Sequence, residues 1–255
     1  SFFRRPYGAD AVIKVQDVHK SFKDVHAVKG VSFAAQDGRI TALLGPNGAG
    51  KSTTLRILST VAAPDSGTAE VAGIDVLDEP MAVRQQIGVL PHNSGLYARL
   101  TAIENIRYYG RLQNIPRADL ETRIEALVEQ LEMADFCNRR TEGFSQGQKI
   151  KVALARALVH DPQHVLLDEP TNGLDVMATR ALREIINKLR RDGKCVLFSS
   201  HIMQEVDALC DDVVVIGRGE VRFDGSIGAL REHAETDDLE EAFIRLAGMD
   251  EGATA

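Results

Sequence analysis

The chain has 255 residues, of which 44% are hydrophobic and 26% are charged, a composition typical of a globular protein with an ample core. Lys and Arg total 30 against 37 Asp and Glu, and the net charge of −7 argues against a protein that coats nucleic acid. No apolar run approaches the roughly 18 residues of a membrane span, and the first residues lack the apolar core of a signal peptide. The three cysteines are an odd number without metal-ligand spacing, which favours a reducing cytosol over a disulfide framework.

The N-terminal part is expected to begin with a flexible arm, residues 1–10, followed by strands of a small antiparallel sheet. A weak surface anchor formed by Phe2, Phe3, Arg4 and Arg5 is the alternative for the arm. Strand patterns cover Val12–Val18, Val25–Phe33 and Thr68–Val71. They do not alternate with helices, so we expect a separate sheet that packs against the main one. Phe22 is expected in the loop between the first two strands, where its ring either stacks on a nucleotide base or packs into the core.

Residues 40–58 have the pattern of a strand, a glycine-rich loop and a helix. Gly45 is followed by four residues and then by Gly50, Lys51 and Ser52, which is the P-loop pattern for holding nucleotide phosphates. Glycines let successive N–H groups point at one anion, and the helix N-terminus adds a positive end. Lys51 is expected to reach the β- and γ-phosphates, and Ser52 to coordinate Mg²⁺. The predicted cradle comprises Gly45, Pro46, Asn47, Gly48, Ala49, Gly50, Lys51, Ser52 and Thr53.

Residues from about 92 to 160 lack strand patterns and are expected to form a helical insert within the α/β scaffold. Thr101 and Glu104 form a capping box, which predicts a helix that ends at Leu112. Apolar residues at helical spacing between Leu120 and Leu131 predict a second helix.

A third helix is predicted within Gly143–Val159, with Ser145 as its N-cap. Small polar residues and Gly147 at the start of this helix are typical of an anion site, so the chain has two such sites. Either they bind two phosphates separately, or both close on one nucleotide. An ordinary capped helix is the remaining alternative.

Two acidic residues end a buried strand at Val165–Glu169. In P-loop enzymes an Asp at this place holds Mg²⁺ through its hydration shell, and we assign this role to Asp168. Glu169 is expected to point elsewhere and to polarise the water that attacks the γ-phosphate. The structural alternative is that both acids cap the following turn.

The last third of the chain is expected to return to the main sheet. Cys195–Ser199 is a buried strand that is predicted to lie beside the strand of Asp168, and His201 follows its C-terminal end. Ligands of open α/β sheets bind outside these ends, so we expect His201 to contact the γ-phosphate; a structural hydrogen bond is the alternative. A strand at Asp212–Ile216 and a short helix ending at Gly248 complete the domain, and residues 249–255 are expected to be a flexible tail.

From about Ala11 to about Gly248 the chain resembles the ATP-binding subunits of ABC transporters. Further phrases, such as SFKDVHAVKGVSF and DEPTNGLDV, are similar to the sodium-exporting NatA group and to neighbouring export-type or drug-resistance ATPases. Six motifs carry the resemblance in the family's order: the adenine-stacking aromatic residue Phe22, Walker A at Gly45–Thr53, the signature sequence at Phe144–Gln148, Walker B at Val165–Glu169, the D-loop at Gly173–Asp175 and the switch histidine His201.

The resemblance implies an α/β fold of the P-loop NTPase class, with a RecA-like parallel-sheet core, an antiparallel β subdomain and a helical insert. One ABC ATPase domain would span residues 11–248. The implied activity is Mg²⁺-dependent hydrolysis of ATP, with Glu169, His201 and Lys51 as catalytic residues.

Members of the family pair head to tail, which would bring the two anion sites together on one nucleotide. The implied partners are therefore a second copy or a homologous ATPase subunit, and a separate membrane-spanning permease through which export is powered. The chain would then work at the cytoplasmic face of the membrane, with no nucleic-acid partner. The alternative is a soluble ABC-type ATPase that acts as an assembly or regulatory factor. The residues that would cover the partner's ATP are Ser145, Gln146, Gly147, Gln148 and Asp175.

Two residues depart from the family pattern. Gln146 replaces the usual Gly of the signature sequence and leaves Ser145 and Gly147 in place. His92 stands where the family usually has Gln, whose amide oxygen meets Mg²⁺ or the attacking water. Because Mg²⁺ prefers oxygen ligands, we expect His92 to act through water or as a mechanical link to the helical insert. A pH-sensing role is the alternative.

Overall fold

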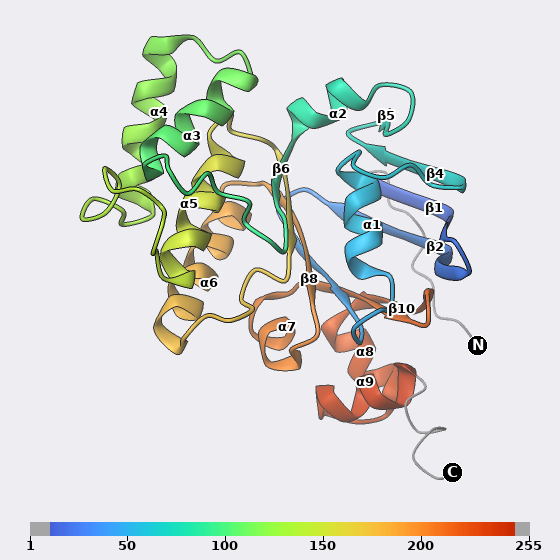
Figure 1. The fold of residues 1–255 in the computed structure, drawn as a ribbon. Coiled ribbons are helices and arrows are strands. Elements are labelled where there is room, and N and C mark those ends of the chain that lie inside the picture. Colours follow the sequence, from blue (N-terminus) through green and yellow to red (C-terminus); the bar gives the residue numbers. More distant parts are fainter. Residues whose placement is uncertain (1–10, 248–255) are drawn as a thin grey trace.

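The structure of the protein is a computed structural model, and it describes residues 11–247. The strands form two sheets, and Figure 1 shows helix α1 (Lys51–Leu58) between them and most other helices on the far side of the larger sheet. The expected N-terminal arm and C-terminal tail lie outside the described residues. Within residues 11–247, no helix combines the length and the apolar character needed to cross a membrane.

The main sheet has six strands in the order β10-β9-β3-β8-β7-β6, and all neighbours are parallel except β10 and β9. The four strands predicted for this sheet are present as β3, β7, β8 and β9, and the strand that ends at Asp168 pairs with the strand before His201, as predicted. Two strands were not predicted: β6 is short and follows a helix directly, and β10 is interrupted in sequence by an Asp and a Gly. The bounds are β3 Ile40–Leu44, β6 Ile87–Leu90, β7 His164–Asp168, β8 Cys195–Ser200, β9 Asp212–Gly217 and β10 Glu220–Ser226.

The second sheet is antiparallel, as predicted, with the order β2-β1-β4-β5. Its first two strands have 12 residues each and are longer than predicted, because irregular pairing lets the ladder continue past each bulge. Phe22 is therefore the last residue of β1, paired with Val25, and the prediction that it lies in a loop was wrong. The bounds are β1 Ala11–Phe22, β2 Val25–Gln36, β4 Ser66–Val71 and β5 Ile74–Asp75.

Helices cover the main sheet where the sequence has helical periodicity. The helix after the P-loop, the three helices of the predicted helical stretch and the short closing helix all form, and a further helix follows the D-loop. The short helices α2, α7 and α8 were not predicted. The bounds are α1 Lys51–Leu58, α2 Pro80–Gln86, α3 Ala102–Leu112, α4 Arg117–Gln130, α5 Gln146–Leu158, α6 Val176–Arg191, α7 Met203–Leu209, α8 Ile227–Ala234 and α9 Leu239–Ala247.

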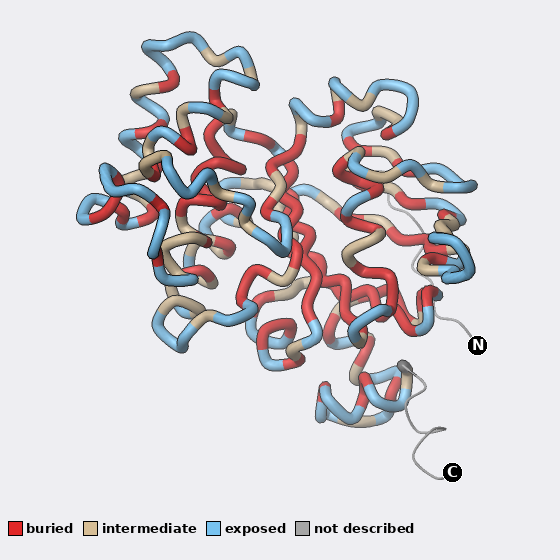
Figure 2. Tube along the Cα trace, in the orientation of Figure 1, coloured by how far each residue is buried: buried red, intermediate tan, exposed pale blue. Residues whose placement is uncertain are grey.

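The two faces of the main sheet face two different apolar clusters, because side chains alternate along each strand. Leu43 and Leu197 face α1 and the antiparallel sheet, whereas Leu44 and Phe198 face the helices on the other side. Figure 2 shows the central strands as an almost continuous buried stretch. Burial on both faces fixes the register of these strands, and with it the positions of the loops at their C-terminal ends.

The helical stretch contains a capping box at the start of α3 and a close contact between α3 and α4. The predicted capping box is present: Thr101 Oγ1 accepts from Glu104 N–H, and the Glu104 carboxylate accepts from Thr101 N–H at 2.8 Å. A Cβ at Gly110 would lie 2.2 Å from Leu120 Cδ1, so Gly110 lets α3 and α4 pack closely. The chain returns to the main sheet at His164.

Two partly or fully buried histidines lie at the opposite end of the main sheet from the P-loop. His160 Nε2 donates to Ile87 O at 3.0 Å, and His164 Nδ1 donates to Gln86 O at 3.2 Å. Burial lowers the pKa of both imidazoles below the ordinary 6.5, and a protonated His160 would place an N–H on Nδ1, which is buried without a partner.

The free energy of unfolding is therefore expected to decrease as the pH falls below about 6.5, where the unfolded chain binds more protons than the folded one. The contribution of these histidines is fully present above that pH and is lost below it. Urea unfolding at about pH 7.5 and about pH 5.5 measures the difference. The difference in the free energy of unfolding between the two pH values should shrink in the double variant His160→Gln, His164→Gln and persist in the exposed control His26→Gln. Equal differences in the wild type and both variants would show that the two buried histidines do not cause it.

Candidate functional site

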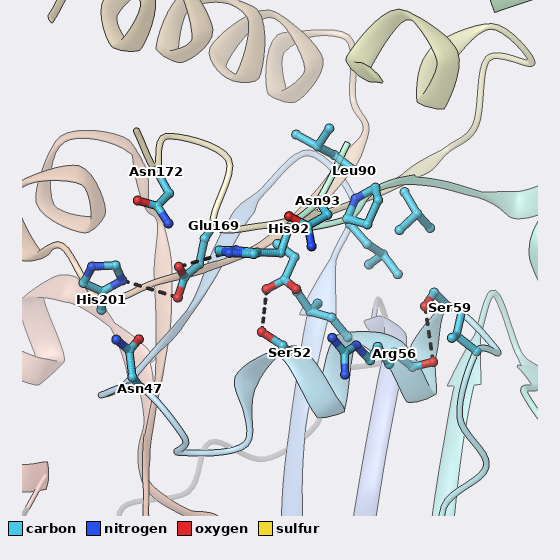
Figure 3. Close-up of a pocket in the computed structure, with 16 residues that line it drawn as sticks. Asn47, Ser52, Arg56, Ser59, Leu90, His92, Asn93, Glu169, Asn172 and His201 are labelled. Carbon is cyan, nitrogen blue, oxygen red and sulfur yellow. Dashed lines mark hydrogen bonds and ion pairs between the residues drawn. The ribbon is translucent and has the colours of Figure 1, made fainter. Parts of the chain in front are cut away.

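A cavity of about 670 Å³ lies at the C-terminal ends of the parallel strands, where the P-loop, the acids at the end of β7 and the histidine after β8 meet (Figure 3). Open parallel sheets bind ligands at this edge. Its polar lining includes six residues with predicted roles, from four separate segments. The lining residues are Asn47, Ser52, Leu55, Arg56, Ser59, Val61, Val89, Leu90, Pro91, His92, Asn93, Leu166, Asp168, Glu169, Asn172 and His201.

The P-loop needs its glycines because it passes close to neighbouring backbone. A Cβ at Gly45 would lie 2.3 Å from Ile216 O in β9, and one at Gly50 would lie 2.5 Å from Ala27 O in β2. Gly50 also has φ 107°, a conformation that residues with a side chain rarely adopt. The loop can therefore wrap tightly at the start of α1, with Gly50 as the N-cap. Pro46, Gly48, Ala49 and Thr53 belong to the same segment without lining the cavity.

Lys51 is buried inside this loop. Its side chain is 4% exposed, and Nζ donates to Gly45 O at 2.7 Å and to Pro46 O at 3.1 Å. Nζ also lies 3.7 Å from Glu169 Oε1. Burial lowers the pKa of Lys51, and the negative charges of Glu169 and Asp168 oppose this shift. The loop thus holds a poorly hydrated ammonium group, and a bound anion can offset the cost of its burial.

Asp168 joins the P-loop to the strands beside it. Ser52 Oγ donates to Asp168 Oδ1 at 2.8 Å, and Ser199 Oγ donates to the same oxygen at 2.7 Å. Ser199 is fully buried and also accepts from Glu169 N–H at 3.0 Å. Sequence analysis did not assign a role to Ser199; its place at the polar end of an apolar strand, two residues before His201, is the signal that could have identified it.

Glu169 lies just past β7 and lines the same cavity as Asp168. Its carboxylate is 11% exposed, and Oε1 accepts from His201 Nδ1 at 3.3 Å. His92 Nδ1 lies 3.7 Å from Oε2, so the two imidazoles approach this carboxylate from two sides (Figure 3). The three nitrogen-bearing side chains around Glu169 keep the carboxylate at the mouth of the P-loop, where it can accept a proton from water.

The oxygen atoms at this edge fit a hard divalent cation. Within residues 11–247, no three His, Cys, Asp or Glu side chains cluster as a metal site. Mg²⁺ in nucleotide sites needs only one or two protein ligands, because phosphates and water supply the others. The Ser52 hydroxyl and the Asp168 carboxylate, 2.8 Å apart, are a donor set of this kind.

The loop after His92 is fastened to the helical layer by Arg156 of α5. This arginine is buried; Nη1 donates to Gly95 O at 3.2 Å, and its guanidinium carbon lies 4.4 Å from the centre of the Tyr109 ring in α3. Burial lowers the pKa of Arg156. The contact with Tyr109 and the bond to Gly95 compensate part of that cost. Sequence analysis did not single out this residue.

The other predicted site residues lie away from the cavity. Phe22 is 45% exposed at the end of β1, with the ammonium group of Lys20 5.5 Å from the centre of its ring. Ser145 and Asp175 are exposed N-caps of α5 and α6; Ser145 Oγ accepts from Gln148 N–H at 3.2 Å, and Asp175 Oδ1 accepts from Ala178 N–H at 2.8 Å. None of the residues from Ser145 to Gln148 lines the described cavity.

Comparisons with known proteins agree with this geometry. A sequence profile of the family described as ABC transporter matches residues 28–172, and a profile of an AAA domain matches residues 138–207. The ABC transporter ATP-binding protein NatA of Bacillus subtilis is 44% identical over 91% of this chain and 97% of its own length. The Nod factor export ATP-binding protein I of Paraburkholderia xenovorans is 36% identical over 87% of this chain and 73% of its own length.

Solved structures give the same result. The ATP-binding subunit of an ABC transporter superposes with a TM-score of 0.85 and 29% identity, covering 92% of this chain and 99% of that structure. A dimeric post-hydrolysis state of the ATP-binding cassette MJ0796, bound to ADP and phosphate, has a TM-score of 0.78 and 27% identity over 84% of this chain and 98% of the cassette. The chain therefore belongs to the ABC transporter family, as one of its ATP-binding, ATP-hydrolysing subunits.

Proposed function

We propose that Glu169 is the general base of ATP hydrolysis at the P-loop cavity and that His201 contacts the γ-phosphate. The observation that carries the proposal is the carboxylate of Glu169, which lies 3.3 Å from His201 and 3.7 Å from Lys51 at the mouth of the loop. The N–H groups of the P-loop and the ammonium group of Lys51 bind the triphosphate. Glu169 accepts a proton from the attacking water, and His201 fixes the direction of its carboxylate.

Ser52 and Asp168 are proposed to hold Mg²⁺. When bound, this ion neutralises part of the charge on the β- and γ-phosphates. Ser199 holds the Asp168 oxygen in place from the other side, since its hydroxyl donates to the same atom as Ser52.

The active form is proposed to be a head-to-tail dimer in which Ser145 and Gly147 of one copy cover the ATP of the other. The α5 helix begins with exposed residues, Ser145 and Gln146, and its N-terminal end is positive and suited to an anion, yet it does not line its own cavity. The related cassette MJ0796 has been solved as a dimer. In this arrangement Asp175 lies near the shared boundary, and Phe22 stacks on the adenine.

The dimer is proposed to power export through a separate membrane-spanning subunit at the cytoplasmic face of the membrane. Similarity to NatA and to a Nod factor export protein supports this assignment. Reconstitution of the chain with its membrane subunit into vesicles tests it, with ATP-driven movement of radioactive sodium as the readout. ATP turnover that is unaffected by any membrane subunit would instead favour a soluble assembly or regulatory factor.

Replacing Glu169 by Gln is expected to leave ATP binding intact and to lower the hydrolysis rate about 100-fold or more, because the amide cannot accept the proton. The variant should accumulate as an ATP-dependent dimer, detectable by gel filtration. Glu125→Gln, on the exposed side of α4, is the matched control. Undiminished turnover in Glu169→Gln would refute the assignment of the base.

Replacing Ser52 by Ala is expected to raise the Mg²⁺ concentration needed for half-maximal turnover about tenfold or more, because one oxygen ligand is lost. Titration of ATPase activity with Mg²⁺ measures this concentration. Ser59→Ala is the control, since this serine lines the same cavity but bonds to Arg56 O. Identical Mg²⁺ curves for the two variants would exclude the proposed metal site.

His92→Gln restores the residue that is usual in the family. It is expected to lower the Mg²⁺ concentration for half-maximal turnover, because an amide oxygen is a better Mg²⁺ ligand than an imidazole nitrogen. The same Mg²⁺ titration, combined with the vesicle assay, provides the measurement. If both Mg²⁺ dependence and transport coupling stay unchanged, His92 has no special role.

A further inference from the structure

A buried carboxyl group with no role in the mechanism above lies behind the catalytic edge. Glu205 of α7 is 4% exposed, and its Oε2 accepts hydrogen bonds from Thr171 Oγ1 and from Ser200 Oγ, the latter at 3.3 Å. Among residues 11–247, no Lys, Arg or His side chain forms an ion pair with it. A buried acid held by hydroxyl groups alone is a costly way to stabilise a fold.

The two hydroxyl groups belong to the two segments that carry the proposed catalytic side chains. Thr171 is two residues after Glu169, in the turn that follows β7. Ser200 directly precedes His201, and its Oγ also accepts from Ile202 N–H at 3.0 Å. One carboxylate oxygen therefore ties the backbone next to the base to the backbone next to the histidine.

The Glu169 segment needs such a tie because its backbone is strained. Glu169 has φ 50°, in the left-handed region that residues with a side chain seldom occupy. Ser199 holds the segment on one side by accepting from Glu169 N–H at 3.0 Å. On the other side, the turn continues with Asn172 N–H donating to Glu169 O at 3.1 Å, and Thr171 bonds to Glu205.

We propose that Glu205 is a positioning residue for ATP hydrolysis, which sets the place of the Glu169 carboxylate relative to His201. This inference rests on the proposed roles of Glu169 and His201. Glu205 does not touch the nucleotide site, as it does not line the cavity. Its effect is exerted on the geometry of the chemical step, whereas the ATP-binding residues of the P-loop keep their own hydrogen bonds.

Substitutions at both ends of the hydrogen bond test this role. Glu205→Leu removes the acceptor at similar size and is expected to lower kcat about tenfold or more, with the KM for Mg-ATP within about twofold of wild type. Glu205→Gln keeps one acceptor oxygen for both hydroxyls and should retain most of kcat. Thr171→Val should lower kcat and Thr171→Ser should not, and combining Thr171→Val with Glu205→Leu should cost no more than the larger single effect.

Controls separate this inference from the assignments on which it rests. Thr141→Val removes another buried hydroxyl, one that donates to Tyr97 O at 3.0 Å, and should leave kcat unchanged. A wild-type kcat in Thr171→Val would overturn the positioning role, and so would equal losses of kcat and of ATP affinity. If Glu169→Gln still abolishes turnover, these outcomes leave the proposed base in place. Undiminished turnover in Glu169→Gln would instead overturn the proposed mechanism itself. Thr171→Val keeps the test decisive if Glu205→Leu does not fold.

Discussion

The two hydrogen bonds that Asp168 Oδ1 accepts from Ser52 and Ser199 form the junction on which the geometry of the site depends. They connect the start of α1 with the ends of β7 and β8, three segments far apart in sequence. Strand pairing already brings these ends to one edge, because β3, β8 and β7 are parallel neighbours. The hydrogen bonds then fix side-chain positions that pairing alone leaves free, so the P-loop and the acids act as one unit.

Features with a local signature could be predicted from the sequence. The P-loop follows from glycine spacing, and the structure explains that spacing by the backbone of β9 and β2, which leaves no room for a side chain at Gly45 and Gly50. Helix α3 has the predicted bounds because its capping box lies within four residues. The acids at the end of β7 were identifiable for the same reason, since the buried apolar residues Val165, Leu166 and Leu167 lead directly into them.

Features that depend on distant partners could not be predicted in this way. Ser199, Glu205 and Arg156 acquire their importance from bonds to residues that lie roughly 30 to 60 positions away. Only Ser199 has a local signal, its place at the polar end of an apolar strand; no local pattern marks Glu205 or Arg156. Phe22 illustrates the same limit: the pairing of β1 with β2 extends to the last two residues and turns an expected loop into a strand end. Sheet register is a tertiary property, decided by burial on both faces.

Within one chain, the P-loop cavity and the exposed start of α5 are separate, but they are mechanically connected. Arg156, in the last turns of α5, donates to Gly95 O, three residues after His92, and His92 lies 3.7 Å from Glu169. Any displacement of α5 relative to β7 must therefore either deform the loop between His92 and Gly95 or break the bond to Arg156. Since the guanidinium group is buried against Tyr109, breaking that bond would remove a hydrogen bond to a buried charged group. This series of contacts is the physical basis for the hypothesis that His92 links the helical insert to the proposed base.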